Sequence, residues 1–274
     1  MRNWQGVVLV DAGNTALKWA RLQALGFGPV QHTPSAPFRD ASHMQQHVEQ
    51  WLLQGESVCE VWLSSVLGAQ FEQCMQRVCA QYAVQLNVVS PNAHPLLHTR
   101  YVQPSQLGKD RWAALLAVAQ RAQALGGAAL HLVLGLGTAT TVDALVHSTV
   151  LEGYWAASTP WVHVGGFIIP GVHTMINSLH QQTAQLPQVE LQMCDWPTHT
   201  EAAIGAGVGH AHLAMAVHCA QSLEAQYGQK PAVWLSGGHA DFMHQHTALR
   251  HAHVLEHAVL HGVCVAFDHP VGAA

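Results

Sequence analysis

The sequence predicts a mixed α/β protein made of two similar halves. Apolar runs of strand length alternate with amphipathic segments of helix length, the alternation starts again near residue 130, and a long helix is expected where the two halves join. The chain has 274 residues, 49% of them hydrophobic, which is enough to fill one large core or two ordinary ones. We therefore expect two βββαβα-like halves.

The first half alternates strands and helices up to a proline-rich segment. β-Branched and apolar residues favour strands on both sides of the turn Ala12-Gly13-Asn14. The expected strands are 7–11, 15–22, 58–66 and 84–90, and the expected helices lie near 43–54, 69–82 and 108–125. Three prolines indicate a loop over residues 91–105, and a Gly-Gly pair ends the long helix at 126.

The second half repeats this pattern. The expected strands are 130–136, 138–146, 149–156, 161–169 and 231–236, and helices are expected after Gly171, after Thr198 and after a Gly-Gly turn at 237–238. Residues 253–267 close the chain. Thr198 with Glu201 has the spacing of a capping box, and Gly228 is a helix stop. Glycines at 205, 207 and 209 indicate either close approach of another backbone or loose helix packing.

Composition excludes several classes of partner. Only 10% of the residues are charged and the formal net charge is −5, so the basic surface that nucleic acid requires is missing. The first residues fit a strand better than a signal peptide, and no apolar stretch reaches the roughly 18 residues that span a bilayer. We expect a cytoplasmic protein with neither nucleic acid nor membrane as a partner.

Cysteine and histidine give little sign of a metal site. The six cysteines contain no CxxC pair, which favours free thiols. The 22 histidines include clusters at 210–212, 244–246 and 251–253, but no acidic residue accompanies these clusters at ligand spacing, so a metal site there is the less favoured interpretation. Most histidines are expected at exposed positions.

Residues 11–18, with the sequence DAGNTALK, form the first candidate site. A tight hairpin here would present backbone N–H groups and the side chain of Thr15 or Asn14 to a phosphate, while Asp11 would hold Mg²⁺ directly or through water. Gly-Asn is also ordinary turn chemistry, so this stretch alone favours a plain hairpin.

The second candidate is GKDR at 108–111, where a helix is expected to begin. Asp110 could act as a base for a hydroxyl nucleophile, and the planar fork of Arg111 suits a carboxylate or a phosphate. A carboxylate in the first helical turn is also favoured simply by the helix dipole, so this stretch alone does not decide its function either.

The third candidate is VLGLGTATTVD at 133–143, where Gly137 permits close backbone approach and Thr138 can donate to a phosphate. The chain has only three lysines, and Lys18 and Lys109 fall within the first two candidate stretches. Scarce cations that lie where a polyphosphate would need them favour a nucleotide site.

In order along the chain, these stretches resemble the motifs of the type III pantothenate kinases, a family of the acetate kinase, sugar kinase, Hsp70 and actin superfamily. The resemblance rests on DAGNTALK at 11–18, GKDR at 108–111, GLGTATTVD at 135–143, GGFIIPG at 165–171, QQTAQLPQV at 181–189 and the late LSGGHA turn. Each motif is weak alone, but their ordered combination covers nearly the whole chain and is specific.

The resemblance implies two RNase H-like (actin-like ATPase) domains, residues 1–113 and 114–274, with an interdomain cleft. ATP and Mg²⁺ would bind along Asp11, Ala12, Gly13, Asn14, Thr15, Ala16, Leu17 and Lys18, with Thr138 at the phosphates and Asp11 as the Mg²⁺ ligand. Pantothenate would contact Tyr101, Gly108, Lys109, Asp110, Arg111 and Thr183, and Asp110 would be the general base. Homodimers and a monovalent cation, K⁺ or NH₄⁺, are further implications.

The sequence departs from the family pattern at the cation position. The family's Asp that binds this ion is replaced by Gly135, which leaves three alternatives: a lost site, a weaker site made by other oxygens, or a chain that catalyses poorly. His199-Thr200 replaces an Asn-Thr pair, and Ser236 replaces a more usual Thr. The rival interpretations are a regulatory relative, described as an accessory factor for gene regulation, and a kinase with a sugar or small-acid acceptor.

Overall fold

The computed structural model describes residues 6–24, 26–54, 58–92, 94–151 and 159–268 and confirms the mixed α/β class. The chain folds into two compact units: residues 1–96, 101–125 and 258–274 form unit 1, and residues 97–100 and 126–257 form unit 2. The predicted domain boundary between residues 113 and 114 falls inside the long helix, all of which lies in unit 1.

Unit 1 is built around a sheet of six strands. Its elements are β1 (Val7–Ala12), β2 (Ala16–Gln23), β3 (Gly26–Phe27), β4 (Gln31–Pro34), η1 (Ala36–Arg39), α1 (Met44–Leu53), β5 (Glu60–Ser65), α2 (Ala69–Gln81), β6 (Gln85–Val88), η2 (Pro104–Gln106), α3 (Lys109–Leu125) and α7 (Ala258–Ala266). The strand order is β3-β2-β1-β5-β6, with β4 also paired to β2. β1 pairs antiparallel with β2 and parallel with β5.

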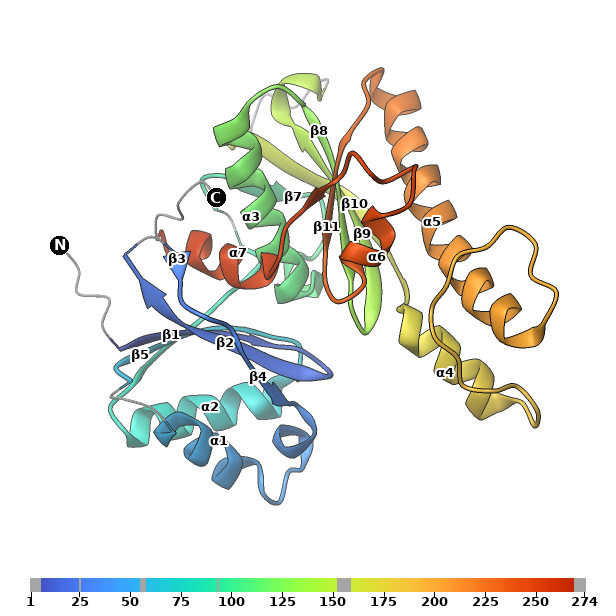
Figure 1. Ribbon diagram of the computed structural model, residues 1–274. Coiled ribbons are helices and arrows are strands. Elements are labelled where there is room, and N and C mark those ends of the chain that lie inside the picture. The colour runs from blue at the N-terminus through green and yellow to red at the C-terminus, as the bar shows by residue number, and fades with distance from the viewer. Residues whose placement is uncertain (1–5, 25, 55–57, 93, 152–158, 269–274) are drawn as a thin grey trace. The chain divides into compact units, whose positions relative to one another are not determined.

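Helices cover both faces of this sheet (Figure 1). α1 and α2 lie on one face, where Val8 and Val10 of β1 join Val61 and Leu63 of β5 in a buried core. α3 and α7 pack against each other on the other face, and a Cβ at Gly262 of α7 would collide with the backbone of α3. β1 is therefore covered on both faces, which explains its continuous apolar run.

Unit 2 contains the second sheet. Its elements are β7 (Leu97–Thr99), β8 (Leu130–Leu136), β9 (Ala139–His147), η3 (Ser148–Val150), β10 (Trp161–Pro170), α4 (Val172–Gln182), α5 (Thr200–Tyr227), β11 (Ala232–Ser236), α6 (Ala240–His244) and β12 (His253–Val254). The strand order is β12-β11-β8-β9-β10-β7. β8 pairs antiparallel with β9 and parallel with β11.

The two sheets share one topology. In each, the first strand lies at the centre, an antiparallel meander of two strands follows on one side and two parallel strands lie on the other; β4, which also pairs with β2, is an addition to the first sheet and β7 to the second. This order and these directions are those of an RNase H-like sheet. The expectation that the pattern starts again near residue 130 is confirmed, because β8 has the place in unit 2 that β1 has in unit 1.

The core of unit 2 lies between the sheet and the helices α5 and α6. Leu132, Leu134 and Leu136 of β8 pack with Leu213 of α5 and Met243 of α6. α5 starts at Thr200 with His199 as its N-cap and no side-chain cap bond, so the predicted capping box at Thr198 is wrong, whereas the stop at Gly228 is confirmed by its φ of 72°. A Cβ at Gly205 would lie 2.5 Å from the Glu190 carbonyl oxygen, which confirms close backbone approach there.

Two other predictions of local structure need correction. The segment 91–105, predicted as a loop, contains β7, whose three residues pair with β10. Of the strand predicted at 149–156, residues 149 and 150 form the end of η3, and residues 152–156 lie outside the described part. The short strands β3, β4 and β12 were not predicted, because strands of two to four residues leave too little periodicity to read.

A buried polar chain holds β7 to the sheet of unit 2. The Thr99 hydroxyl contacts His163 Nδ1 at 2.9 Å, and His163 Nε2 contacts Asp143 Oδ1 at 2.9 Å. All three residues are buried. Fewer than half of the described histidines are exposed, contrary to expectation, and His163 shows why: some histidines satisfy buried polar groups.

Within the described residues, no helix is long and apolar enough to cross a bilayer.

Candidate active site

The β1–β2 hairpin carries the first group of predicted site residues. Its antiparallel register pairs Asp11 directly with Lys18, so the two side chains lie on one face of the sheet. The Gly13 N–H donates to the Ala16 carbonyl at 3.2 Å and closes the turn. Asn14 and Thr15 are exposed at its tip. The sequence thus places a carboxylate, an ammonium group and an exposed turn together by register alone.

The tip of the hairpin is held by the segment that follows β4. The buried Ser35 hydroxyl donates to the Gly13 carbonyl at 2.6 Å, and the Ser35 N–H donates to the Thr15 carbonyl at 3.0 Å. Arg39 Nη2 donates to Asn14 Oδ1 at 3.0 Å. These bonds fix the turn backbone that is expected to face a phosphate.

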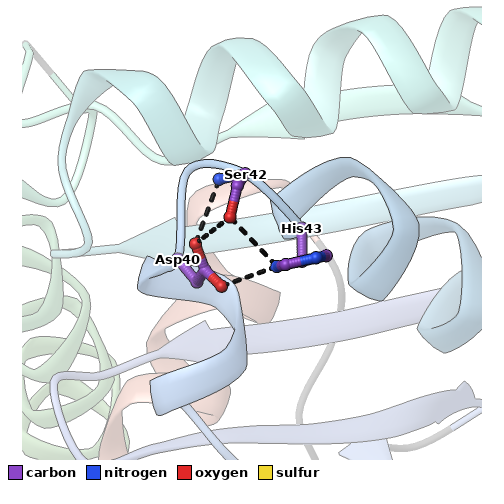
Figure 2. Close-up of polar contacts among 3 residues, drawn as sticks. All are labelled: Asp40, Ser42 and His43. Carbon is purple, nitrogen blue, oxygen red and sulfur yellow. Dashed lines mark hydrogen bonds and ion pairs between the residues drawn. The ribbon is translucent and has the colours of Figure 1, made fainter.

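A compact polar network orders the chain just beyond Arg39 (Figure 2). The Asp40 carboxylate accepts from the Ser42 hydroxyl at 2.6 Å and the Ser42 N–H at 3.1 Å, and it pairs with His43 Nδ1 at 2.8 Å. The bonds from Ser42 and then His43 lower the pKa of Asp40 to about 2. His43 is the N-cap of α1, so the network joins η1 to α1 and supports the segment that holds the hairpin.

Asp11 is the electrostatic centre of this group. Burial raises the pKa of Asp11 to about 7, Lys18 opposes this rise, and the negative charge of Asp110 adds to it. A carboxylate in this position is short of positive charge, and a divalent cation is the kind of ligand that would supply it. The residues present therefore fit Mg²⁺ at Asp11.

Asp110 lies in the first turn of α3, within the electrostatic range of Asp11. Its Oδ1 accepts from the Arg111 N–H at 2.8 Å. A Cβ at position 108 would lie 2.6 Å from that same Oδ1, so only glycine at 108 leaves the carboxylate where it is. Gly108 thus has a physical role next to Asp110.

Arg111 and Lys109 have different partners. Arg111 is buried, its Nη1 donates to the Tyr101 hydroxyl at 3.1 Å, and its Cζ lies 5.8 Å from the centroid of the Tyr101 ring. Lys109 Nζ forms an ion pair with Glu72 Oε1 of α2 at 2.5 Å. Tyr101, Asp110 and Arg111 therefore form one group in unit 1, whereas Lys109 is directed to α2.

Unit 2 carries Thr138 in the turn between β8 and β9. The Thr138 carbonyl accepts from the Gly171 N–H at 3.0 Å and from the Thr174 hydroxyl at 2.7 Å. Gly171 is the N-cap of α4, and a Cβ there would lie 2.7 Å from the Thr138 carbonyl oxygen. Glycine therefore brings the amino end of an 11-residue helix against the turn, where its N–H groups favour an anion.

Gly135 lies in β8 between β9 and β11, opposite Thr141 and Ser236. A Cβ at 135 would lie 2.7 Å from Thr141 Oγ1, so the threonine hydroxyl fills the space that a side chain would take. Because β8 is paired on both sides, its backbone carbonyls serve the sheet. Gly135 thus offers a cation no carboxylate.

A family model described as type III pantothenate kinase matches residues 7–222. The chain belongs to the type III pantothenate kinase family.

Two relatives with the name type III pantothenate kinase align over most of their length. The protein of Janthinobacterium sp. (strain Marseille) is 32% identical, with 96% of this chain and 98% of the relative covered. The protein of Herminiimonas arsenicoxydans is 29% identical, with coverage of 90% and 92%. A solved structure from Campylobacter jejuni, assigned to the Baf family of transcriptional activators, superposes with a TM-score of 0.59 at 16% identity and covers 95% of this chain and 97% of its own. This last likeness concerns the fold alone.

In this member of the pantothenate kinase family, Thr183 lies apart from Thr138, the other predicted binding residue of unit 2. Its hydroxyl donates to the Leu179 carbonyl at 2.8 Å and accepts from the Leu186 N–H at 3.3 Å. It follows α4, whose 11 residues place it about 16 Å from the Gly171 end at the helical rise of 1.5 Å. The site roles assigned by resemblance stay predictions.

Sequence reasoning missed several residues that shape these groups. Ser35 and Arg39 hold the hairpin tip, Glu72 pairs with Lys109, and His173 and His239 flank the Thr138 turn. His239 stands inside the LSGGHA motif, so its position next to a Gly-Gly turn was a usable signal. Glu72 gave no comparable signal, because a glutamate in the first turn of a helix is ordinary.

Asp11→Asn is expected to stabilise the protein more at about pH 8 than at about pH 5. The folded pKa lies above the unfolded one, so the folded state loses stability as pH rises from about 4 towards about 7. We expect the variant to unfold with roughly 1–4 kcal/mol more free energy than the wild type at the higher pH, with Lys18 reducing the gain.

Urea unfolding at both pH values measures this effect. Asp195→Asn, at an exposed position, is the control, and its effect should be small at both values. An Asp11→Asn effect of equal size at pH 5 and pH 8 would contradict the assignment.

Proposed function

We propose that this chain transfers the γ-phosphate of ATP to the primary hydroxyl of pantothenate and forms 4′-phosphopantothenate, the first step of coenzyme A biosynthesis, in the cytoplasm. The observation that carries this proposal is the family match over residues 7–222, which includes the hairpin of Asp11 and Lys18 and the Asp110–Arg111 pair. All four of these residues lie in unit 1.

The residue roles follow the same proposal. The hairpin from Asp11 to Lys18 and the Thr138 turn bind ATP, and Asp11 holds Mg²⁺. Pantothenate is bound by Tyr101, by residues 108–111 and by Thr183. The buried Arg111, oriented by the Tyr101 hydroxyl, supports the assignment of a carboxylate clamp, since a guanidinium held in one orientation suits the planar carboxylate of pantothenate.

Asp110 is the general base in this proposal. Phosphoryl transfer depends mainly on alignment and on charge neutralisation, and a positioned carboxylate accepts the hydroxyl proton as the bond to phosphorus forms. The Arg111 N–H bond and the space left by Gly108 hold the Asp110 carboxylate in one place. Mg²⁺ at Asp11 would neutralise charge on the phosphates.

The rival function is that of a weakly active or non-catalytic regulatory relative. Gly135 favours it, because the family's cation-binding carboxylate is missing. The retention of Asp11, Lys18, Asp110 and Arg111 in one unit favours the kinase. A coupled assay of ADP release with ATP and pantothenate separates the two, since a regulatory protein would release no pantothenate-dependent ADP.

Asp110→Asn is expected to lower turnover by about 10²- to 10⁴-fold, because asparagine keeps the shape but cannot accept the proton. The same ADP-release assay measures the loss, and circular dichroism checks that the fold is intact. Asp195→Asn, an exposed position in unit 2, is the control and should retain full turnover. Turnover close to that of the wild type in Asp110→Asn would exclude this residue as the base.

The wild type is expected to release ADP at a rate independent of K⁺ or NH₄⁺, because Gly135 provides no carboxylate to bind the ion. Gly135→Asp should introduce a dependence on K⁺, provided that the Thr141 hydroxyl rotates away from the new side chain. Gly135→Asn matches the shape without the charge and should not. A wild-type rate that rises several-fold with K⁺ would show that other oxygens hold the ion.

We also propose that the protein is a homodimer through α4 and α5 of unit 2. An apolar groove of about 480 Å³ between these helices is lined by Met175, Leu179, Leu186 and Ile204, among others. Leu179→Arg should shift the sedimenting species from dimer to monomer, because it places a charge in the groove. Leu53→Arg, an exposed position on α1, is the control and should remain dimeric; a monomeric wild type would overturn the proposal.

A further inference from the structure

Two histidines from different helices meet beside the Thr138 turn. His173 lies in the first turn of α4 and His239 is the N-cap of α6, and their ring centroids are 4.7 Å apart at an interplanar angle of 65°. Backbone bonds hold both segments at the turn: the N–H of Gly171, two residues before His173, donates to the Thr138 carbonyl, and the His239 N–H donates to the Leu136 carbonyl at 3.4 Å.

The surface next to this pair consists largely of exposed backbone. Residues 137–139 of the turn and Gly237 and Gly238 before α6 are exposed. A Cβ at Gly237 would lie 2.6 Å from the Leu136 carbonyl oxygen, so the two turns pack backbone to backbone. His173 is exposed and His239 is half-buried, which makes His173 the ring that a ligand on this surface can reach.

Unit 2 places no lysine or arginine of its own at this end of the sheet. Its three such residues are Arg100, Lys230 and Arg250. Lys230 and Arg250 precede β11 and β12, which run parallel to β8. They therefore lie at the amino ends of these strands, opposite to the turn that follows β8. Arg100 follows β7, which pairs with the beginning of β10, far from the Pro170 end of that strand. A cationic side chain from unit 2 at the Thr138 turn must therefore be a histidine.

The free protein disfavours a charge on the His239 ring. Burial is the main cause that lowers the pKa of His239, and the charges of His173 on α4 and His212 on α5 lower it further. The hydrogen bond with the Leu136 carbonyl of β8 acts in the opposite direction and raises it. His239 Nδ1 is buried without a hydrogen-bond partner among the described residues. His173 lies in the first turn of α4, where the helix favours negative charge. An anion bound there would favour a positive charge on the exposed His173 ring.

We propose that His173 takes up a proton from solvent when the polyphosphate of a nucleotide binds at the Thr138 turn, and that the resulting imidazolium supplies the positive charge that Gly135 cannot recruit as a bound cation. His239 stays neutral, because a second charge 4.7 Å away would be repelled. The inference rests on the proposed nucleotide site and does not depend on pantothenate.

Linkage gives the direction of the effect. A ligand that raises the pKa of His173 binds more tightly as pH falls, and the gain is complete below the pKa of the free ring. The affinity for the nucleotide should therefore rise by up to about tenfold from about pH 8 to about pH 6, and His173→Gln should remove that rise.

Titration calorimetry with Mg²⁺ and a non-hydrolysable ATP analogue tests the proposal, in buffers of different ionisation enthalpy at about pH 7.5. The slope of binding enthalpy against ionisation enthalpy gives the number of protons taken up. We expect the wild type to take up about one proton more than His173→Gln, at most, when the analogue binds. Comparison between variants cancels protons released from Asp11 or from the analogue itself.

His180→Gln, at the other end of the same helix, is the matched control and should keep the wild-type slope. His239→Gln should also keep the proton uptake. Loss of uptake in that variant alone would show that His239 takes up the proton and would overturn the assignment to His173. Equal slopes in the wild type and in His173→Gln would overturn the proposal while leaving the kinase activity untouched. Absence of analogue binding would overturn both this inference and the proposed nucleotide site.

Discussion

The pairing of Asp11 with Lys18 across the central hairpin is the constraint around which unit 1 is organised. β1 is buried on both faces and paired on both edges, so a carboxylate at its end has little water and few partners. Lys18 offsets part of this cost, and the remainder appears as the raised pKa of Asp11. A site that holds an incompletely compensated carboxylate is less stable than an apolar one, and it is suited to a cation for the same reason.

In unit 2, the candidate site depends on close backbone packing that only glycine allows. Gly171 and Gly237 bring a helix and a second turn against the backbone around Leu136 and Thr138, and any side chain at either position would collide with a carbonyl group. The result is a surface of backbone groups and the amino end of α4, which is fixed before any ligand arrives. Where unit 1 uses side-chain charge held by strand register, unit 2 uses the dipoles of peptide groups held by close packing.

The sequence was sufficient for what depends on local pattern and on ordered motifs. The strands β1, β2, β8 and β10 and the helices α2 and α3 were predicted within two residues of their ends, and so was the repetition of the pattern. What failed depended on tertiary partners: β7 is a strand only because β10 and the buried chain from Thr99 to Asp143 hold it, and α5 begins without the cap that Thr198 and Glu201 suggest. Asp11, Asp110 and Arg111, which the motifs singled out, lie in one unit, yet the Glu72 partner of Lys109 could not be read from any spacing.

The distribution of charge explains why histidine matters in this chain. Of the three lysines, Lys18 faces Asp11 and Lys109 faces Glu72, while Lys230 precedes β11 at the far edge of its sheet. Polyphosphate binding needs positive charge close to each phosphate group, and a fixed cation next to the amino end of a helix would be costly when no ligand is bound. A histidine suits such a place, because its charge depends on the groups around it. In the proposal for His173, part of the positive charge at the Thr138 turn is therefore present only when the ligand is bound.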